Sequence, residues 1–175
     1  GVLEPIVQRR KNTRVFQGPA PEALPLHVRP TSAGWLVQSQ YGFEAEPADW
    51  RAVTERTPTD QEMRDAVFAW RVCGATTSNS IVIAQQETAW GIGAGQQNRV
   101  EASEIARNKA DGRGRGGALA SDAFFPFPDG IEVAAEAGVA VVVQPGGSIR
   151  DDEVIARANE LGVARVMTGE RQFRH

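Results

Sequence analysis

The chain has 175 residues, a length that fits one domain or at most two small ones. Apolar residues make up 41% and charged residues 23%, which is the composition of a globular protein and excludes an intrinsically disordered chain. The 19 Lys and Arg against 22 Asp and Glu leave a net charge of −3, so we expect neither nucleic acid nor an anionic membrane as a partner.

Residues 1–56 are the least regular part of the sequence. A basic run, Gln8–Arg14, is followed by several prolines that break any long helix. We interpret the run as a solvated surface rather than a binding patch, since no aromatic residues interleave it. Gly34–Gln38 predicts a strand. We expect residues 1–56 to be an irregular segment with short strands that is part of the same domain as the rest.

The first clear helix signal lies after Thr57. Thr59 and Glu62 have the spacing of a capping box, in which each side chain bonds the main-chain N–H of the other residue. Apolar residues then follow at helical spacing, and the pattern ends near Gly74. The apolar positions are Met63, Ala66, Val67 and Trp70.

The next segments predict a buried hairpin and a second helix. Ser80–Ala84 is a short apolar strand, which indicates burial on both faces, and Ala89–Gly93 returns as its partner. A helix with Val100 on it then runs to about Lys109. The Arg-Gly stretch Asp111–Gly117 is too short to indicate RNA binding, so we interpret it as a flexible surface loop.

The last third alternates helices and strands. Asp129 is expected to cap a helix to Ala137, Val139–Val143 is a buried strand, Ser148 opens a helix, and Val163–Met167 is the next strand. A strand, a helix and a strand joined by short loops form a parallel unit. The order of elements therefore predicts an α/β fold with a mixed sheet covered on both faces.

Composition also bears on the compartment. The lone Cys73 excludes a disulfide framework and favours a reducing compartment. The start of the sequence lacks the charges of a secretory signal, and the longest apolar run, Ala137–Val143, is too short to span a bilayer. We expect a cytoplasmic protein.

Several chemistries are disfavoured by counting. The soft metal ligands are Cys73, His27 and His175, too scattered for an ordinary zinc site, and no Gly-x-Ser-x-Gly elbow supports a serine nucleophile. Gly91–Gly95 invites a dinucleotide-binding interpretation, but Asn98 stands where the last glycine should be and the acidic partner is missing. The glycines could still let the main chain approach a ligand closely.

Three further segments have open interpretations. Gln144–Ser148 follows a buried strand, so its N–H groups suit a carboxylate, phosphate or polar ring, unless it is a plain turn with Ser148 as the N-cap. The aromatic residues of Phe124–Phe127 are core side chains or stack on a flat heterocycle. The terminal run Glu170–His175 directly follows a buried strand and could fold back over it.

These segments, taken in order, are similar to a known family. Together they closely resemble the AICAR formyltransferase domain of the bifunctional purine biosynthesis family, in which that domain follows an IMP cyclohydrolase domain. The resemblance covers essentially the whole chain and is clearest from Thr57 onward. The matching strings are Ser78–Ser80, Gly91–Arg99, Ser121–Asp129, Gln144–Asp151 and Arg171–His175.

The resemblance implies a fold and a reaction. The fold is a zinc-free, cytidine-deaminase-like three-layer α-β-α arrangement that occurs twice in tandem, with residues 57–175 as the second unit. The enzyme is a homodimer with shared active sites. It moves a formyl group from 10-formyltetrahydrofolate to the 5-amino group of AICAR, a purine-precursor ribotide, in de novo purine biosynthesis.

The resemblance also implies two sets of ligand-binding residues. The AICAR set is Asn79, Arg99, Phe124 and Arg171, with Asn79 also supporting catalysis. The folate set is Val100, Asp129, Ser148 and Ile149. Some relatives hold a monovalent cation near the segment that contains Asp122 and Ser78, so potassium is a further hypothesis.

One departure from the family limits these expectations. The family's catalytic Lys-His pair lies in the first unit, and this sequence contains no Lys-His dipeptide. We therefore expect a fragment, inactive alone, that lacks this half of the site and the cyclohydrolase domain. The alternatives are a non-catalytic module for folate or nucleotide binding or for dimer assembly, and, less favoured, a nicotinamide-dependent oxidoreductase.

Overall fold

The computed structural model describes residues 3–9, 12–19, 26–39 and 42–174. The chain divides into two compact units, Gly1–Tyr41 and Gly42–His175. The division falls inside the segment 1–56, and residues after it contribute a strand to the larger unit. That the first unit belongs to the same domain as the second stays a prediction.

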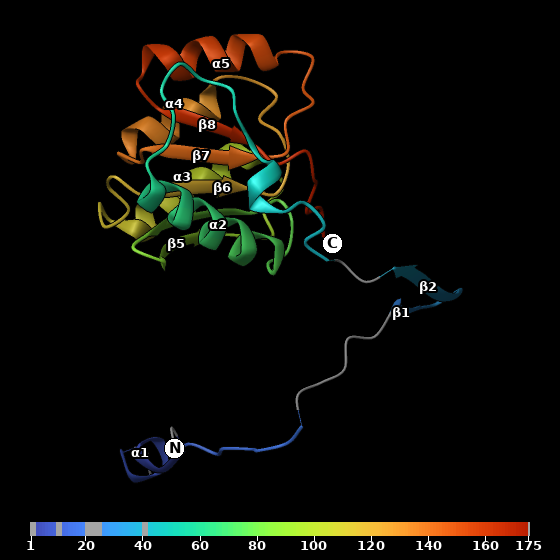
Figure 1. Cartoon of the computed structure of the whole chain (residues 1–175). Helices are drawn as coiled ribbons and strands as arrows, with labels where there is room; N and C mark the ends of the chain where they lie inside the picture. Colours follow the sequence, from blue (N-terminus) through green and yellow to red (C-terminus); the bar gives the residue numbers. More distant parts are fainter. Residues whose placement is uncertain (1–2, 10–11, 20–25, 40–41, 175) are drawn as a thin grey trace. The chain divides into compact units, whose positions relative to one another are not determined.

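The described residues of the smaller unit form a helix and a hairpin (Figure 1). The helix is α1, Leu3–Arg9, and the antiparallel strands are β1, Leu26–Thr31, and β2, Gly34–Ser39. The strand predicted at Gly34–Gln38 is confirmed. In the pairing register, Val28 lies opposite Val37 and Pro30 opposite Trp35, so these four residues share one face of the hairpin, while Leu36 lies on the other.

The larger unit is built on a six-stranded mixed sheet with the order β3-β8-β7-β6-β4-β5. The strands β6, β7 and β8 are parallel, β4 is antiparallel to β5 and β6, and β3 is antiparallel to β8. The predicted mixed sheet is confirmed, although β3 and β6 were not predicted. The bounds are β3 Arg51–Ala52, β4 Ile81–Gln85, β5 Thr88–Gly93, β6 Ala118–Ser121, β7 Val141–Gln144 and β8 Ala164–Met167.

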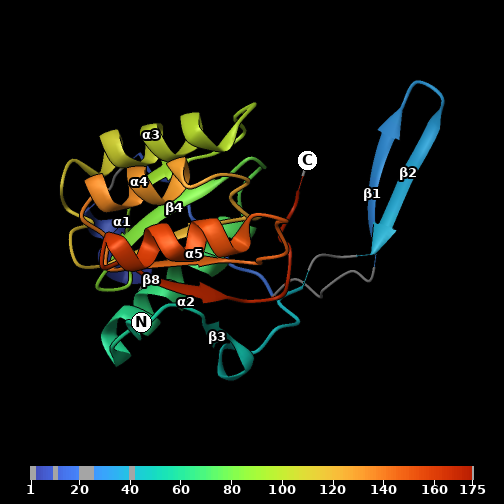
Figure 2. The same ribbon diagram turned by 90° about the horizontal axis from the view of Figure 1, so that it is seen from above.

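Helices cover both faces of this sheet, which makes three layers (Figure 2). On one face α2, Asp60–Gly74, packs against the alternate strand residues of one core cluster. On the other face lie α3, Arg99–Ala110, α4, Asp129–Glu136, and α5, Asp151–Glu160. The short 3-10 helix η1, Pro47–Asp49, precedes β3.

The helix α2 forms as its sequence predicts. The Thr59 hydroxyl accepts a hydrogen bond from Glu62 N, and the Glu62 carboxylate accepts one from Thr59 N, at 3.3 and 2.9 Å. Trp70 is buried and contacts Trp50 edge to face, with ring centroids 6.1 Å apart. The predicted capping box and the end at Gly74 are confirmed.

Two predicted helix caps are wrong. The helix α4 has Pro128 as its N-cap, and Asp129 is its first residue, with Oδ1 accepting from Gly130 N at 2.8 Å. A carboxylate in the first turn still interacts favourably with the helix dipole. The helix α5 begins only at Asp151, with Arg150 as its N-cap. The Ser148 hydroxyl accepts from Arg150 N at 3.2 Å, before the helix, and the Asp151 carboxylate accepts from Gly147 N and Ser148 N.

The glycines of β5 allow close packing with α3. A Cβ atom at Gly91 would lie 1.9 Å from Ala106 O, and one at Gly93 would lie 2.0 Å from Ala102 O. These two glycines therefore seat the helix backbone on the strand, and the expectation that they admit a ligand is wrong for both.

Gly91→Ala tests this packing directly. The added methyl group meets main-chain atoms that cannot rotate away, so we expect a loss of at least about 2 kcal/mol in the free energy of unfolding, measured by chemical denaturation. Gly42→Ala is the matched control, since its Cβ has open space around it. Equal stability of the two variants would contradict the described packing.

Candidate functional site

The parallel strands bring several polar residues to one edge of the sheet. The carboxyl ends of β6, β7 and β8 point to the same side in Figure 1, and the C-terminal segment lies there too. In open α/β sheets this edge is the usual place for a ligand. Asp122 follows β6, Gln144 ends β7 and Thr168 follows β8.

A buried ion pair lies at this edge. The Asp122 side chain is fully buried, and its Oδ1 accepts from Arg99 Nη2 at 3.1 Å. The Arg99 side chain is 17% exposed, and its guanidinium carbon lies 5.6 Å from the ring centre of Phe173. Asp122 Oδ2 and Arg99 Nε make no hydrogen bond with the residues that the structure describes.

The C-terminal segment is fixed against the same strands. Gln172 N donates to Asp122 O at 3.0 Å, Ser78 N donates to Arg174 O at 2.7 Å, and Arg174 N donates to Ser78 Oγ at 2.7 Å. The expectation that this segment folds back over the sheet is confirmed for residues up to 174. His175 lies outside the described residues.

A cavity of about 390 Å³ opens beside the ion pair. Four of the eight predicted ligand residues line it, two from each set. They are Asn79, Arg99, Val100 and Asp129. The other lining residues belong to neither expected ligand set, although all of them fall within the matching strings. These are Gln97, Asn98, Phe125, Pro126 and Phe127.

Asn79 lies just before β4 and is held there by the turn after β5. Its Nδ2 donates to Gln96 O at 2.8 Å and to Gln97 O at 3.1 Å. No described residue donates to its Oδ1, so the carbonyl half of this amide is available as an acceptor. Asn98 forms the N-cap of α3 by accepting from Glu101 N, which places Arg99 and Val100 in the first turn.

The aromatic loop divides between core and surface. Phe125 is 1% exposed and belongs to the core cluster under α3 and α4, whereas Phe127 is 47% exposed. The Arg150 guanidinium lies 4.9 Å from the Phe127 ring centre, within range of a cation–π interaction. Phe124 is half-buried and does not line the cavity. The core interpretation is therefore confirmed for Phe125, and stacking on a flat heterocycle stays a prediction for the exposed Phe127.

The loop after β7 has fewer unpaired main-chain N–H groups than its sequence indicates. Gly147 N and Ser148 N both donate to Asp151 Oδ2, at 2.7 and 3.1 Å, while Asp151 Oδ1 accepts from the buried Arg165 at 2.5 Å. The expectation of free N–H groups is wrong for these two. Ser148 is half-buried, Ile149 is fully exposed, and neither lines the cavity.

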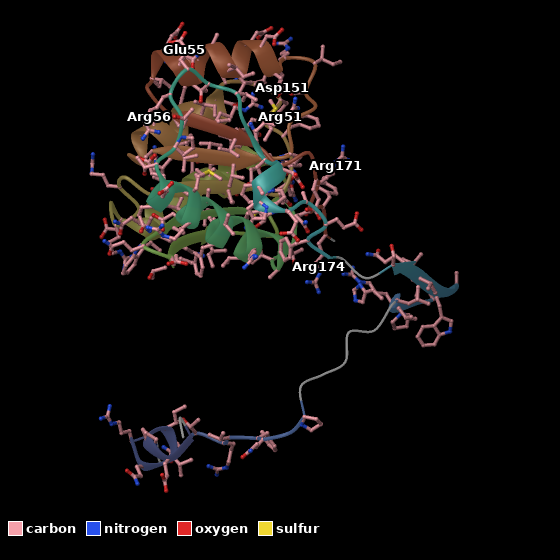
Figure 3. All side chains as sticks on the ribbon, viewed as in Figure 1. Arg51, Glu55, Arg56, Asp151, Arg171 and Arg174 are labelled. Carbon is pink, nitrogen blue, oxygen red and sulfur yellow. The ribbon has the colours of Figure 1, made fainter. Side chains whose placement is uncertain are left out.

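Arg171 is exposed on the C-terminal segment. Its side chain has no partner within the described ranges and does not line the cavity. Figure 3 shows Arg171 and Arg174 on the side where β7 and β8 end, and Arg56 on the opposite side. Arg56 has a different role, since it pairs with Glu62 and donates to Ala140 O before β7.

Among the residues that the structure describes, the other reactive groups form no alternative centre. Burial raises the pKa of the Cys73 thiol to about 12, because the charged thiolate loses its hydration. Over the residues the structure describes, no group of three or more His, Cys, Asp and Glu could hold a metal ion. Within those ranges, too, no helix is both long and apolar enough to cross a bilayer.

The raised pKa predicts an inert cysteine. At pH 8 Cys73 stays protonated and buried, and the thiol is not the nucleophile in disulfide exchange. We expect an aromatic disulfide reagent to label it only as the chain unfolds, and at once in guanidinium, where its pKa returns to about 8.5. Labelling within seconds in native buffer at pH 8 would show that the thiol is accessible.

Comparison with known proteins identifies the family to which the chain is similar. The family model for the AICARFT/IMPCHase bienzyme matches residues 3–109, which is more than half of the chain. The chain is 51% identical over 178 residues to the bifunctional purine biosynthesis protein PurH of Acidithiobacillus ferrooxidans, and 42% identical over 174 residues to that of a Nostoc species. These matches cover 98% and 97% of the chain, but only 34% of each relative. The chain thus spans about a third of the length of these relatives.

Proposed function

The chain belongs to the AICARFT/IMPCHase bienzyme family, and on this basis we propose that it forms part of an AICAR formyltransferase site. The reaction would transfer the formyl group of 10-formyltetrahydrofolate to AICAR in purine biosynthesis. The cavity carries the proposal, because residues expected to bind the ribotide and residues expected to bind folate line it together. Two substrates that exchange a group must meet in one place.

The ribotide would be held mainly by cationic and amide groups. Arg99 lies at the cavity with its guanidinium oriented by Asp122, and Asn79 Oδ1 can accept from an amino or carboxamide N–H of the substrate. Arg171 is exposed and without a partner in the described parts, which suits a phosphate group arriving from solvent. Phe124 would contribute from the neighbouring loop.

The folate would approach from the start of α4. One oxygen of Asp129 is occupied by Gly130 N, and the other can accept from the amino group of a pterin ring. Val100 and the exposed Phe127 add apolar surface for the ring. Ser148 and Ile149 lie on the next loop and would contact the outer part of the folate.

In the proposed step the amino nitrogen of AICAR attacks the formyl carbon. The bond between that carbon and folate N10 breaks, and one proton passes from the amino group to N10. AICAR's amino group is a weak nucleophile because its lone pair is delocalised, so the step needs a positioned base. Asn79 would orient the amino group. The Lys-His pair of the family is absent from these 175 residues, so the chain alone would not catalyse transfer.

The remaining expectations stay proposals. We propose that residues 57–175 are the second of two tandem cytidine-deaminase-like units in a cytoplasmic homodimer with shared active sites. The three-layer mixed sheet is compatible with such a unit. The alternative, a non-catalytic module for folate or nucleotide binding or for dimer assembly, would keep the same cavity without catalysing transfer.

Potassium binding near Asp122 and Ser78 is also proposed. The buried Asp122 Oδ2 has no partner among the described residues, and oxygen ligands of this kind suit a hard monovalent cation. We expect the midpoint of thermal unfolding to be higher in potassium chloride than in tetramethylammonium chloride at the same ionic strength. Asp122→Asn should abolish this difference. Equal midpoints for the unmodified chain in the two salts would remove the proposal.

Formyl transfer and binding test the function together. Calorimetry should detect AICAR and 5-formyltetrahydrofolate bound to the chain, and Asp129→Asn should weaken folate about tenfold while leaving AICAR and stability nearly unchanged. Asp152→Asn on exposed α5 is the matched control. Transfer should be absent with the chain alone and appear when the relatives' preceding region is added.

The outcomes separate the proposals. Transfer by the chain alone would contradict the half-site proposal. Binding of both ligands, with no transfer even in the mixture, would favour the non-catalytic module. Binding of neither ligand to the chain would remove the assignment of the cavity.

A further inference from the structure

Gln144 occupies an unusual position for an amide side chain. It is the last residue of β7, a central strand of the sheet, and it is fully buried. Its Oε1 accepts from Phe125 N at 2.8 Å, while its Nε2 makes no hydrogen bond in the described ranges. A buried amide with one unpaired half is costly, so core packing alone gives no reason for glutamine here.

The side chain of Gln144 fixes the aromatic loop. Phe125 N is the loop's buried donor, and without an acceptor it would be left unsatisfied. The Phe125 ring also lies against the α4 backbone, since a Cβ at Gly130 would come within 2.4 Å of it. These two contacts set where Pro126 and Phe127 stand in the cavity wall.

The main chain of Gln144 fixes a second segment. Gln144 O accepts from Thr168 N at 2.9 Å, and Pro145 O accepts from Gly169 N at 3.1 Å, just after β8. The Thr168 hydroxyl then donates to Glu170 O at 3.0 Å, directly before Arg171. Two loops that carry expected ligand residues, Phe124 and Arg171, are thus bonded to one residue.

From these contacts we propose that Gln144 is a positioning residue for the candidate site. Its carboxamide holds the aromatic loop in the position that forms the cavity wall, and through that loop it governs ligand affinity. The ligand part of this proposal rests on the proposed function. The loop part does not, because the hydrogen bond from Phe125 N is made by the chain alone.

Gln144→Met tests the proposal, because methionine has nearly the same shape and lacks the acceptor. Val143→Ala is the matched control: it weakens the same strand on its other face, toward α2. We expect Gln144→Met to speed hydrogen exchange of the Phe125 amide at least tenfold relative to amides in α2. We expect it to weaken 5-formyltetrahydrofolate binding about tenfold. In Val143→Ala the exchange rate of the Phe125 amide should change only as much as the rates of other amides in the sheet. The affinity for 5-formyltetrahydrofolate should stay within twofold.

Two further variants keep the test decisive. Gln144→Glu retains an oxygen at the same distance along the side chain, so protection of the Phe125 amide should be restored. If Gln144→Met does not fold, Gln144→Asn is used, since it keeps the amide but is one methylene too short to reach Phe125 N.

The readouts distinguish the two ways of failing. Unchanged Phe125 exchange in Gln144→Met would overturn the proposal, and so would faster exchange with unchanged affinity. If the unmodified chain binds no folate, the folate part of the proposed function fails, and the exchange comparison alone then decides whether Gln144 holds the loop.

Discussion

The burial of one carboxylate, that of Asp122, organises the edge of the sheet on which the candidate site lies. A buried carboxylate is stable only with a partner, and Arg99 provides it at 3.1 Å from the start of α3. The main chain of Asp122 also bonds Ser80 O and Gln172 N, so strand, helix and C-terminal segment meet at this residue. Because Arg99 must stay with Asp122, its guanidinium is oriented at the cavity before any ligand arrives.

The position of Arg99 depends in turn on how closely α3 approaches the sheet. The buried face of α3 consists of small residues, and it lies on the glycines of β5 with almost no space between the backbones. A larger residue at Gly91 or Gly93 would lift the helix and carry its first turn away from Asp122. The glycine run that suggests a nucleotide-binding loop in the sequence therefore acts indirectly, by fixing the helix that presents Arg99 and Val100.

Sequence patterns predicted the elements that depend on residues close together in the chain. The capping box at Thr59 and the apolar periodicity of α2 depend on nearby residues, and both were found as expected. The strand β6 was not, because Ala118–Ser121 consists mostly of small residues with weak strand propensity, and only its buried place between β4 and β7 makes it a strand. Two side-chain contacts were not predicted for the same reason. The hydrogen bond between Gln144 and Phe125 and the ion pair between Asp151 and Arg165 join segments that only the order of strands in the sheet brings together.

The expected ligand residues fall into two physical groups. Asn79 and Arg99 are held by hydrogen bonds or an ion pair within the described chain, so in the proposed site they would bind a ligand without first being ordered. Ile149 and Arg171 are exposed and lack such support. Burying an exposed isoleucine side chain contributes about 1.5–3 kcal/mol to the binding free energy of the group that covers it. The cavity's selectivity would thus come from the fixed group, while the affinity gained from the exposed group depends on how far a ligand or another part of the protein extends over these loops.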